Sequence, residues 1–159
     1  MIFESPTHGP MALTQVVDYL AAYIREAPDQ QHKVIIGTDS SPAQAGLAQF
    51  ITAIVVHRVG RGGIYFWTQS QQDKLHTLRD RMYHEAVCSL NLARQLVDPQ
   101  LVMLGLDGAH TVEIHIDIGE NGPTRQMIKE IVGMVAGSGF TVRTKPASFA
   151  ASKVADRYT

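Results

Sequence analysis

The sequence predicts a single α/β domain on a five-stranded mixed sheet, with the first strand in the centre and helices on both faces. The chain has 159 residues, which suffices for one ordinary domain but not for two. After an N-terminal helix at about residues 12–26, the hydrophobic patterns follow the order three strands, helix, strand, helix, strand, helix. Residues 1–159 contain no internal repeat and no long linker, so we expect one domain.

The composition excludes several classes of protein. The chain is 45% hydrophobic and 18% charged, which is typical of a folded protein and not of a disordered one. It has no run of about 20 apolar residues and no basic and apolar leader, so we expect neither a membrane span nor export. Cys88 is the single cysteine, which excludes an internal disulfide and a cysteine-based zinc site and favours a cytoplasmic location. The net charge of −1 excludes binding to nucleic acid by charge alone.

The first predicted elements are a helix and a buried strand. Apolar residues at helical spacing predict a helix over residues 13–24, which Pro28 closes. The β-branched run at residues 33–39 has no helical period and precedes a turn-prone Ser-Ser-Pro sequence. We therefore expect a strand that ends at Asp39.

A hairpin and a long helix follow. Two β-rich runs at residues 50–59 and 64–68 flank the Gly-Arg-Gly-Gly sequence at 60–63, which is a hairpin pattern. The three strands therefore form an antiparallel meander. Apolar residues recur every three or four positions over residues 74–97 and predict a helix that packs on this meander.

The remaining elements alternate between strand and helix. Residues 111–118 alternate apolar and polar side chains, as expected of a strand. A helix follows from Pro123 in its first turn to about Gly137, and then a short strand at 140–143. Residues 148–158 predict a last helix.

Four carboxylates lie at informative places in this order, namely Asp39, Glu85, Asp117 and Asp156. If the first and fourth strands are parallel neighbours, Asp39 and Asp117 share the carboxyl edge of the sheet, where α/β folds place their ligands. Two such acids repel each other unless a cation lies between them. A hard divalent ion, Mg²⁺ or Mn²⁺, is the natural occupant.

Four segments resemble a known family. They are Ile-Gly-Thr-Asp-Ser at 36–40, His-Ile-Asp-Ile-Gly at 115–119, the Gly-rich run at 133–140 and the C-terminal block at 145–156. Together they are similar to the bacterial YkuK-type family, a functionally uncharacterised family within the ribonuclease H-like superfamily. The resemblance spans nearly the whole chain and implies a ribonuclease H-like fold.

The resemblance also implies a set of site residues. The superfamily carries an Asp on its first strand, a Glu on its first crossover helix, an Asp on its fourth strand and a further acid on a late helix. By resemblance, Asp39, Glu85, Asp117 and Asp156 take these positions.

Such a set suits two-metal hydrolysis of a phosphodiester, in which one ion activates water and the other stabilises the leaving oxygen. We expect Asp39 to bridge the two ions and Asp117 to complete the shell of one. Glu85 would orient the leaving-group side or a bound water, and Asp156 would complete the water-activating site. The ions would also supply the positive charge that the composition lacks. The hypothesis is a Mg²⁺- or Mn²⁺-dependent nuclease or phosphodiesterase acting on RNA, DNA or a hybrid.

Four further residues are candidates for substrate binding, namely Lys145, Ser40, Arg81 and Lys153. Lys145 is the most informative because it follows the fifth strand, near the expected metal edge. Basic and hydroxyl side chains of this kind contact phosphates. The sequence is also compatible with a homo-oligomer.

Each candidate ligand has a simpler interpretation. Asp39 could begin a turn, Asp117 could cap a loop, Glu85 could be exposed at the shoulder of its helix, and Asp156 could lie on a frayed end. A lone strand histidine such as His115 is more often a satisfied core residue than a ligand.

Two other functions remain as alternatives. The fold could serve as a non-catalytic binding or assembly module. Residues 117–124 also resemble the phosphate loop of actin-like ATPases, although one domain of 159 residues supplies only half of such a nucleotide clamp. The chain departs from many superfamily nucleases because no histidine follows His115 and no long basic insertion is present.

Overall fold

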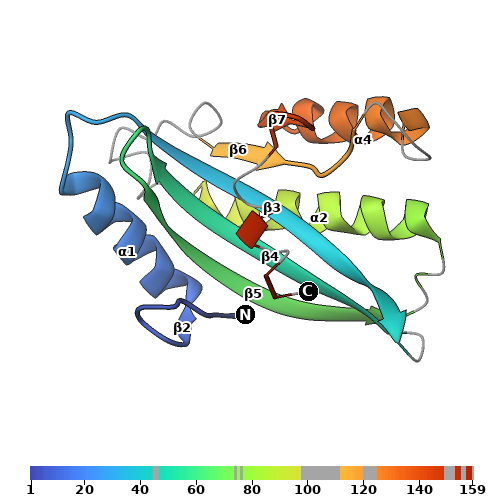
Figure 1. Cartoon of the computed structure of the whole chain (residues 1–159), viewed down its shortest axis with the longest axis horizontal. Coiled ribbons are helices and arrows are strands. Elements are labelled where there is room, and N and C mark those ends of the chain that lie inside the picture. The colour runs from blue at the N-terminus through green and yellow to red at the C-terminus, as the bar shows by residue number, and fades with distance from the viewer. Residues whose placement is uncertain are drawn as a thin grey trace.

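The computed structural model describes residues 1–44, 47–73, 75, 77–97, 112–119, 125–148, 153–154 and 157–158. Its centre is a five-stranded sheet in the order β5-β4-β3-β6-β7 (Figure 1). The strands are β3 (His32–Gln44), β4 (Leu47–Arg58), β5 (Gly63–Asp73), β6 (Val112–His115) and β7 (Thr141–Arg143). The first three are antiparallel, and β6 and β7 add in parallel beside β3. The predicted mixed sheet with its first long strand in the centre is confirmed.

In the described part of the chain, three helices cover one face of this sheet. They are α1 (Leu13–Arg25), α2 (Leu78–Leu96) and α4 (Arg125–Gly137). Their apolar sides share one core with the strands, and Leu20, Ile36, Ile54 and Ile131 in it are fully buried. In the part of the chain that the structure describes, no helix is both long and apolar enough to cross a membrane.

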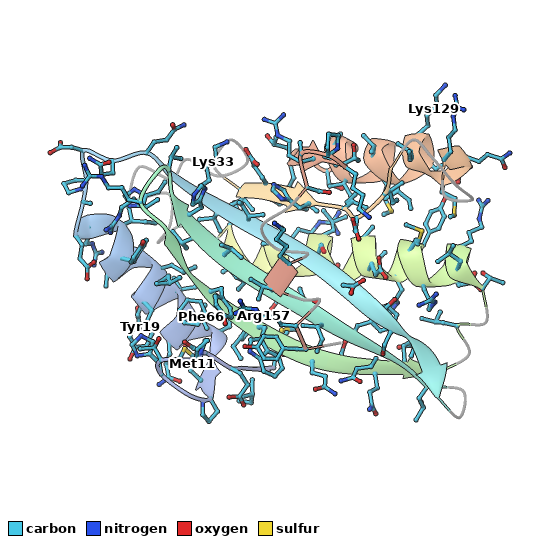
Figure 2. The ribbon with its side chains drawn as sticks, viewed as in Figure 1. Met11, Tyr19, Lys33, Phe66, Lys129 and Arg157 are labelled. Carbon is cyan, nitrogen blue, oxygen red and sulfur yellow. The ribbon has the colours of Figure 1, made fainter. Side chains whose placement is uncertain are left out.

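The C-terminal segment lies on the other face, in front of β3 and β4 in Figure 1. Lys153 and Val154 are helical, and Val154 packs against Ile35 and Val55. Tyr158 stacks on Trp67 with 4.2 Å between ring centroids. Figure 2 shows Arg157 over the sheet, where its Nη1 donates to Tyr65 Oη at 3.5 Å. The helix expected over residues 148–158 is only partly seen, because Ser148 is not helical, residues 157–158 form a turn, and residues 149–152, 155 and 156 fall outside the described residues.

The central strand is longer than predicted. It does not end at Asp39, because β4 continues to pair with it through Ser40 opposite Phe50 and Ser41 opposite Gln49. Its parallel partner β6 is shorter than the expected 111–118, and the last pair joins Gly37 to His115. The two strands therefore part just before the candidate acids.

The long helix begins later than residue 74. Strand β5 extends to Asp73, and Thr77 then caps α2 by accepting a hydrogen bond from the Asp80 backbone N–H at 3.0 Å. The Asp80 carboxylate accepts in return from the Thr77 backbone N–H at 3.3 Å, which completes a capping box. This local motif outweighs the apolar periodicity that suggested an earlier start.

Two short strands at the N-terminus were not predicted. They are β1 (Ile2–Phe3) and β2 (Met11–Ala12), which pair with each other. Glu4 bridges to Trp67 on β5 through hydrogen bonds at 2.7 and 3.0 Å. The start of α1 is thereby attached to the β5 edge of the sheet.

Candidate active site

The register of β3 and β6 brings two acids to the same edge of the sheet. Asp39 and Asp117 each lie two residues beyond the last pair, Gly37 and His115. Ile116 and Ile118 belong to the main core, so Asp117 between them faces the opposite side. The predicted parallel pairing is confirmed, and a shared metal ion remains a prediction.

Glu85 is buried on α2, with only 8% of its surface exposed. Its Oε1 accepts a hydrogen bond of 2.6 Å from Ser40 Oγ, and Arg81 Nη1 donates to the same hydroxyl at 3.4 Å. The interpretation of Glu85 as an exposed helix residue is therefore wrong. Among the predicted site residues, Ser40 therefore contacts both Glu85 and Arg81.

The electrostatics connect Glu85 to both Asp39 and Asp117. The pKa of Glu85 is raised from 4.5 to about 7, mainly because burial penalises the charged form. The negative charges of Asp39 and Asp117 raise this pKa further, while the hydrogen bond from Ser40 and the charge of Arg81 lower it. The three carboxylates thus share one electrostatic environment, in which a cation would relieve their repulsion.

Lys145 lies at the same edge. Its Nζ is 2.8 Å from Asp117 Oδ1, with 54% of the Lys145 side chain and 26% of the Asp117 side chain exposed. The Lys145 backbone N–H donates to the Ile118 carbonyl at 3.0 Å, which holds the segment after β7 beside Asp117. The predicted position of Lys145 is confirmed, and its contact with substrate stays a prediction.

Sequence reasoning missed a row of buried hydroxyls beneath these acids. Thr38 Oγ1 lies 3.0 Å from Thr52 Oγ1 and 2.8 Å from Ser89 Oγ. The spacing in the sequence could have indicated this polar row, because Ser89 follows Glu85 by four residues and so lies on the same side of α2. Together the two polar positions interrupt the apolar stripe of the helix where it faces β3.

His115 and Cys88 lie in environments that suit structural residues. His115 is 3% exposed, and its Nε2 lies 3.0 Å from Glu113 Oε2, as expected of a buried structural histidine. Burial and the charge of Glu85 raise the pKa of Cys88 to about 11. The thiol therefore stays protonated at neutral pH and is a poor nucleophile.

The donor chemistry of the site suits a hard divalent ion, since Asp39, Glu85 and Asp117 offer only carboxylate oxygens. Among the residues that the structure describes, no three His, Cys, Asp or Glu side chains form a group that could hold a metal ion. Asp156 lies outside the described residues, as do residues 120–124 of the alternative phosphate loop. Lys153 is exposed on the C-terminal helical turn.

Comparisons with known proteins extend over nearly the whole chain. The protein-family description "Ribonuclease H-like" matches residues 15–159. The uncharacterized protein YkuK of Bacillus subtilis (strain 168) is 29% identical over 167 residues, covering 99% of this chain and 96% of YkuK. A crystal structure of Prototype Foamy Virus Protease-Reverse Transcriptase (native) matches 80% of this chain with a TM-score of 0.39 and 14% identity. That match spans 21% of the longer viral polypeptide.

Proposed function

The chain belongs to the Ribonuclease H-like family, and from this premise we propose that it is a divalent-metal-dependent hydrolase of phosphodiester bonds in nucleic acid. The observation that supports the proposal is that Asp39 and Asp117, acids from distant parts of the chain, both act electrostatically on the buried Glu85. Asp39 and Asp117 follow the last β3–β6 pair on neighbouring strands. Glu85 approaches from α2, and its pKa responds to both of their charges.

The proposed roles follow from these positions. Asp39 would hold Mg²⁺ or Mn²⁺ as the central ligand, and Asp117, Glu85 and Asp156 would supply the other carboxylate oxygens. Such ions, when bound, lower the pKa of the attacking water and stabilise the leaving oxygen. Ser40 orients the Glu85 carboxylate through its 2.6 Å hydrogen bond.

Basic residues near these acids are proposed to contact the substrate. Lys145 is the first candidate, because its ammonium group already lies at the acidic edge and more than half of its side chain is exposed. Arg81, beside Ser40, and the exposed Lys153 are proposed to bind neighbouring phosphates. Bound cations would offset the net charge of −1 at the point where the polyanion approaches.

The test incubates the purified protein with labelled single-stranded, duplex and RNA–DNA hybrid oligonucleotides in Mn²⁺, Mg²⁺ or EDTA. We expect cleavage that requires a metal ion and that Asp39→Asn reduces by at least about 100-fold. Asp18→Asn is the matched control, because it removes the same charge from the exposed side of α1. Its cleavage rate should equal that of the wild type.

Two results would contradict the proposal. If none of the substrates is cut in either metal, the fold serves as a non-catalytic binding or assembly module. If Asp39→Asn cuts as fast as the wild type, hydrolysis does not depend on the proposed centre.

A further inference from the structure

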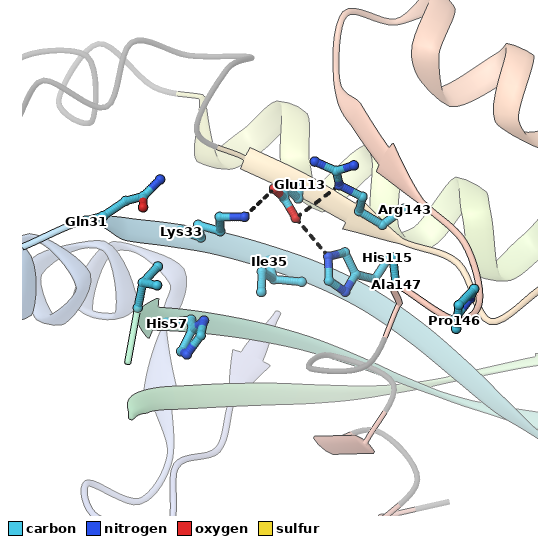
Figure 3. Close-up of a pocket in the computed structure, with 10 residues that line it drawn as sticks. Gln31, Lys33, Ile35, His57, Glu113, His115, Arg143, Pro146 and Ala147 are labelled. Carbon is cyan, nitrogen blue, oxygen red and sulfur yellow. Dashed lines mark hydrogen bonds and ion pairs between the residues drawn. The ribbon is translucent and has the colours of Figure 1, made fainter. Parts of the chain in front are cut away.

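A separate pocket lies on the sheet face opposite α1, α2 and α4, near the start of β3 (Figure 3). Its volume is about 390 Å³, and strands β3, β4, β6 and β7 and the segment after β7 all contribute to its wall. The charged side chains in it come from three strands, namely Lys33, Glu113 and Arg143. None of them belongs to the proposed metal centre.

Glu113 holds the basic groups of this pocket in place. Its Oε1 lies 3.2 Å from Lys33 Nζ, and its Oε2 lies 3.0 Å from His115 Nε2 and 3.8 Å from Arg143 Nε. The Glu113 side chain is 11% exposed, whereas those of Lys33 and Arg143 are 36% and 48% exposed. The carboxylate is therefore less accessible to solvent than the two cations, and Figure 3 shows it between Lys33 and Arg143.

The charge of the pocket is positive at neutral pH. Burial acts to raise the pKa of Glu113, but hydrogen bonds from His115 and Lys33 and the charges of Lys33 and Arg143 lower it overall, so the carboxylate stays ionised. One carboxylate thus faces two permanent cations.

The cations can bind more than Glu113. A lysine carries three donors and an arginine five, which exceeds what a single carboxylate can accept from them. A site that served only to neutralise Glu113 would need one cation. The second cation and the exposure of both indicate an anionic ligand that approaches from solvent.

The remaining wall is suited to a flat, weakly polar group. Ile35 is buried at its base, Val59 is 40% exposed at its rim, and the His57 ring and Pro146 complete it. The volume lies at the lower end of the range for small-molecule sites, about 300 to 1,000 Å³. An anion-binding end next to an apolar wall is the pattern that a phosphorylated nucleoside fits.

We propose that this pocket binds a nucleoside monophosphate group, with the phosphate between Lys33 and Arg143. The base lies against Val59 and the His57 ring. The pocket adjoins the candidate active site, because His115 and Asp117 are two residues apart, about 7 Å along an extended chain. The nucleotide is therefore either free in solution or the phosphorylated end of a nucleic-acid strand.

The test is calorimetric titration of the full chain with AMP, adenosine and inorganic phosphate in EDTA at low salt. We expect AMP to bind at least about tenfold more tightly than adenosine or phosphate, since only AMP engages both parts of the pocket. Lys33→Gln and Arg143→Gln should each weaken AMP binding by at least about tenfold, the effect of losing one charge-assisted hydrogen bond. Lys129→Gln is the matched control on α4, away from the pocket in Figure 2, and should bind AMP like the wild type.

A second variant tests the apolar wall without removing a charge. Val59→Trp fills the pocket from an exposed position, so it should fold normally and lose AMP binding. Thermal melting of each variant establishes that it is folded. Absence of AMP binding at millimolar concentration, or equal binding by the wild type and the two charge variants, would overturn the proposal.

The source of the nucleotide is found with short oligonucleotides. If a tetranucleotide with a 5′-phosphate binds more tightly than AMP, the ligand is a strand end. The same tetranucleotide with a 5′-hydroxyl, or the 5′-phosphorylated one tested on Lys33→Gln, should then lose this tighter binding. Equal or weaker binding than AMP identifies a free nucleotide. Because EDTA prevents metal-dependent hydrolysis, this result stands apart from that of the cleavage assay.

Discussion

Replacing Glu85 by glutamine should make the metal-free protein more stable at alkaline pH. The pKa of the buried carboxyl is raised from 4.5 to about 7 in the folded protein. One pKa unit corresponds to about 1.4 kcal/mol, so ionised Glu85 lowers the free energy of unfolding by about 3 kcal/mol. Glutamine is uncharged, and its amide oxygen can still accept the hydrogen bond from Ser40.

The sign of the pH dependence follows from proton counting. Below pH 4.5 the carboxyl is protonated in both states and carries no penalty. Between pH 4.5 and about 7 the folded state keeps a proton that the unfolded state has lost, so stability falls as pH rises. Above about pH 7 the full penalty is present.

The assay is urea unfolding of the wild type and Glu85→Gln in EDTA across this pH range. We expect nearly equal stability near pH 4 and a gain of up to about 3 kcal/mol for Glu85→Gln above pH 7, equivalent to roughly 6–12 °C in melting temperature. A difference that does not change with pH, or a wild type that is the more stable protein at alkaline pH, would refute the reasoning. Replacing EDTA by Mg²⁺ or Mn²⁺ should then stabilise the wild type more than the variant.

Two further substitutions test the neighbours of this carboxylate. Ser40→Ala removes the hydroxyl that donates to Glu85 at 2.6 Å, so the pKa of Glu85 should rise further. In the same urea assay, the free energy of unfolding should fall by about 1–3 kcal/mol above pH 7 and by less near pH 4. An equal loss at both pH values would show that the hydrogen bond does not favour the charged form. Lys145→Gln should change the free energy of unfolding by less than about 1 kcal/mol, because the ion pair with Asp117 is exposed to solvent, while it raises the KM for oligonucleotide cleavage. A loss of several kcal/mol would mean that Lys145 is a structural residue.

Much of the fold was predictable because it rests on local patterns. The spacing of apolar residues over 13–24 identified α1, and the glycine-rich turn at 60–63 identified the hairpin of β4 and β5. The alternation around Asp117 separated Ile116 and Ile118, which enter the core, from the acid between them. These features depend on side-chain polarity at fixed intervals, which can be counted along the chain.

The predictions from sequence were wrong where a residue's structure depends on a partner that is distant in the sequence. The turn-prone residues after Asp39 remain in β3 because β4 supplies hydrogen bonds to them. The orientation of Glu85 depends on Ser40, which is 45 residues away in sequence and meets it only when α2 packs on the sheet. A helical periodicity places a residue at an angle to the apolar stripe but does not reveal which polar group the neighbouring strand presents.

The sequence by itself determined the mixed sheet, the order of its five strands along the chain, and Asp39 and Asp117 as the acids of interest on or next to its two central strands. Tertiary structure alone decided that Glu85 is buried against Ser40, and that Lys33, Glu113 and Arg143 converge in one pocket. The physical reason is the distance along the sequence between the residues that determine each feature. Strand and helix patterns are set by neighbours within a few residues, whereas burial and the pKa values that follow from it depend on groups brought together by chain folding.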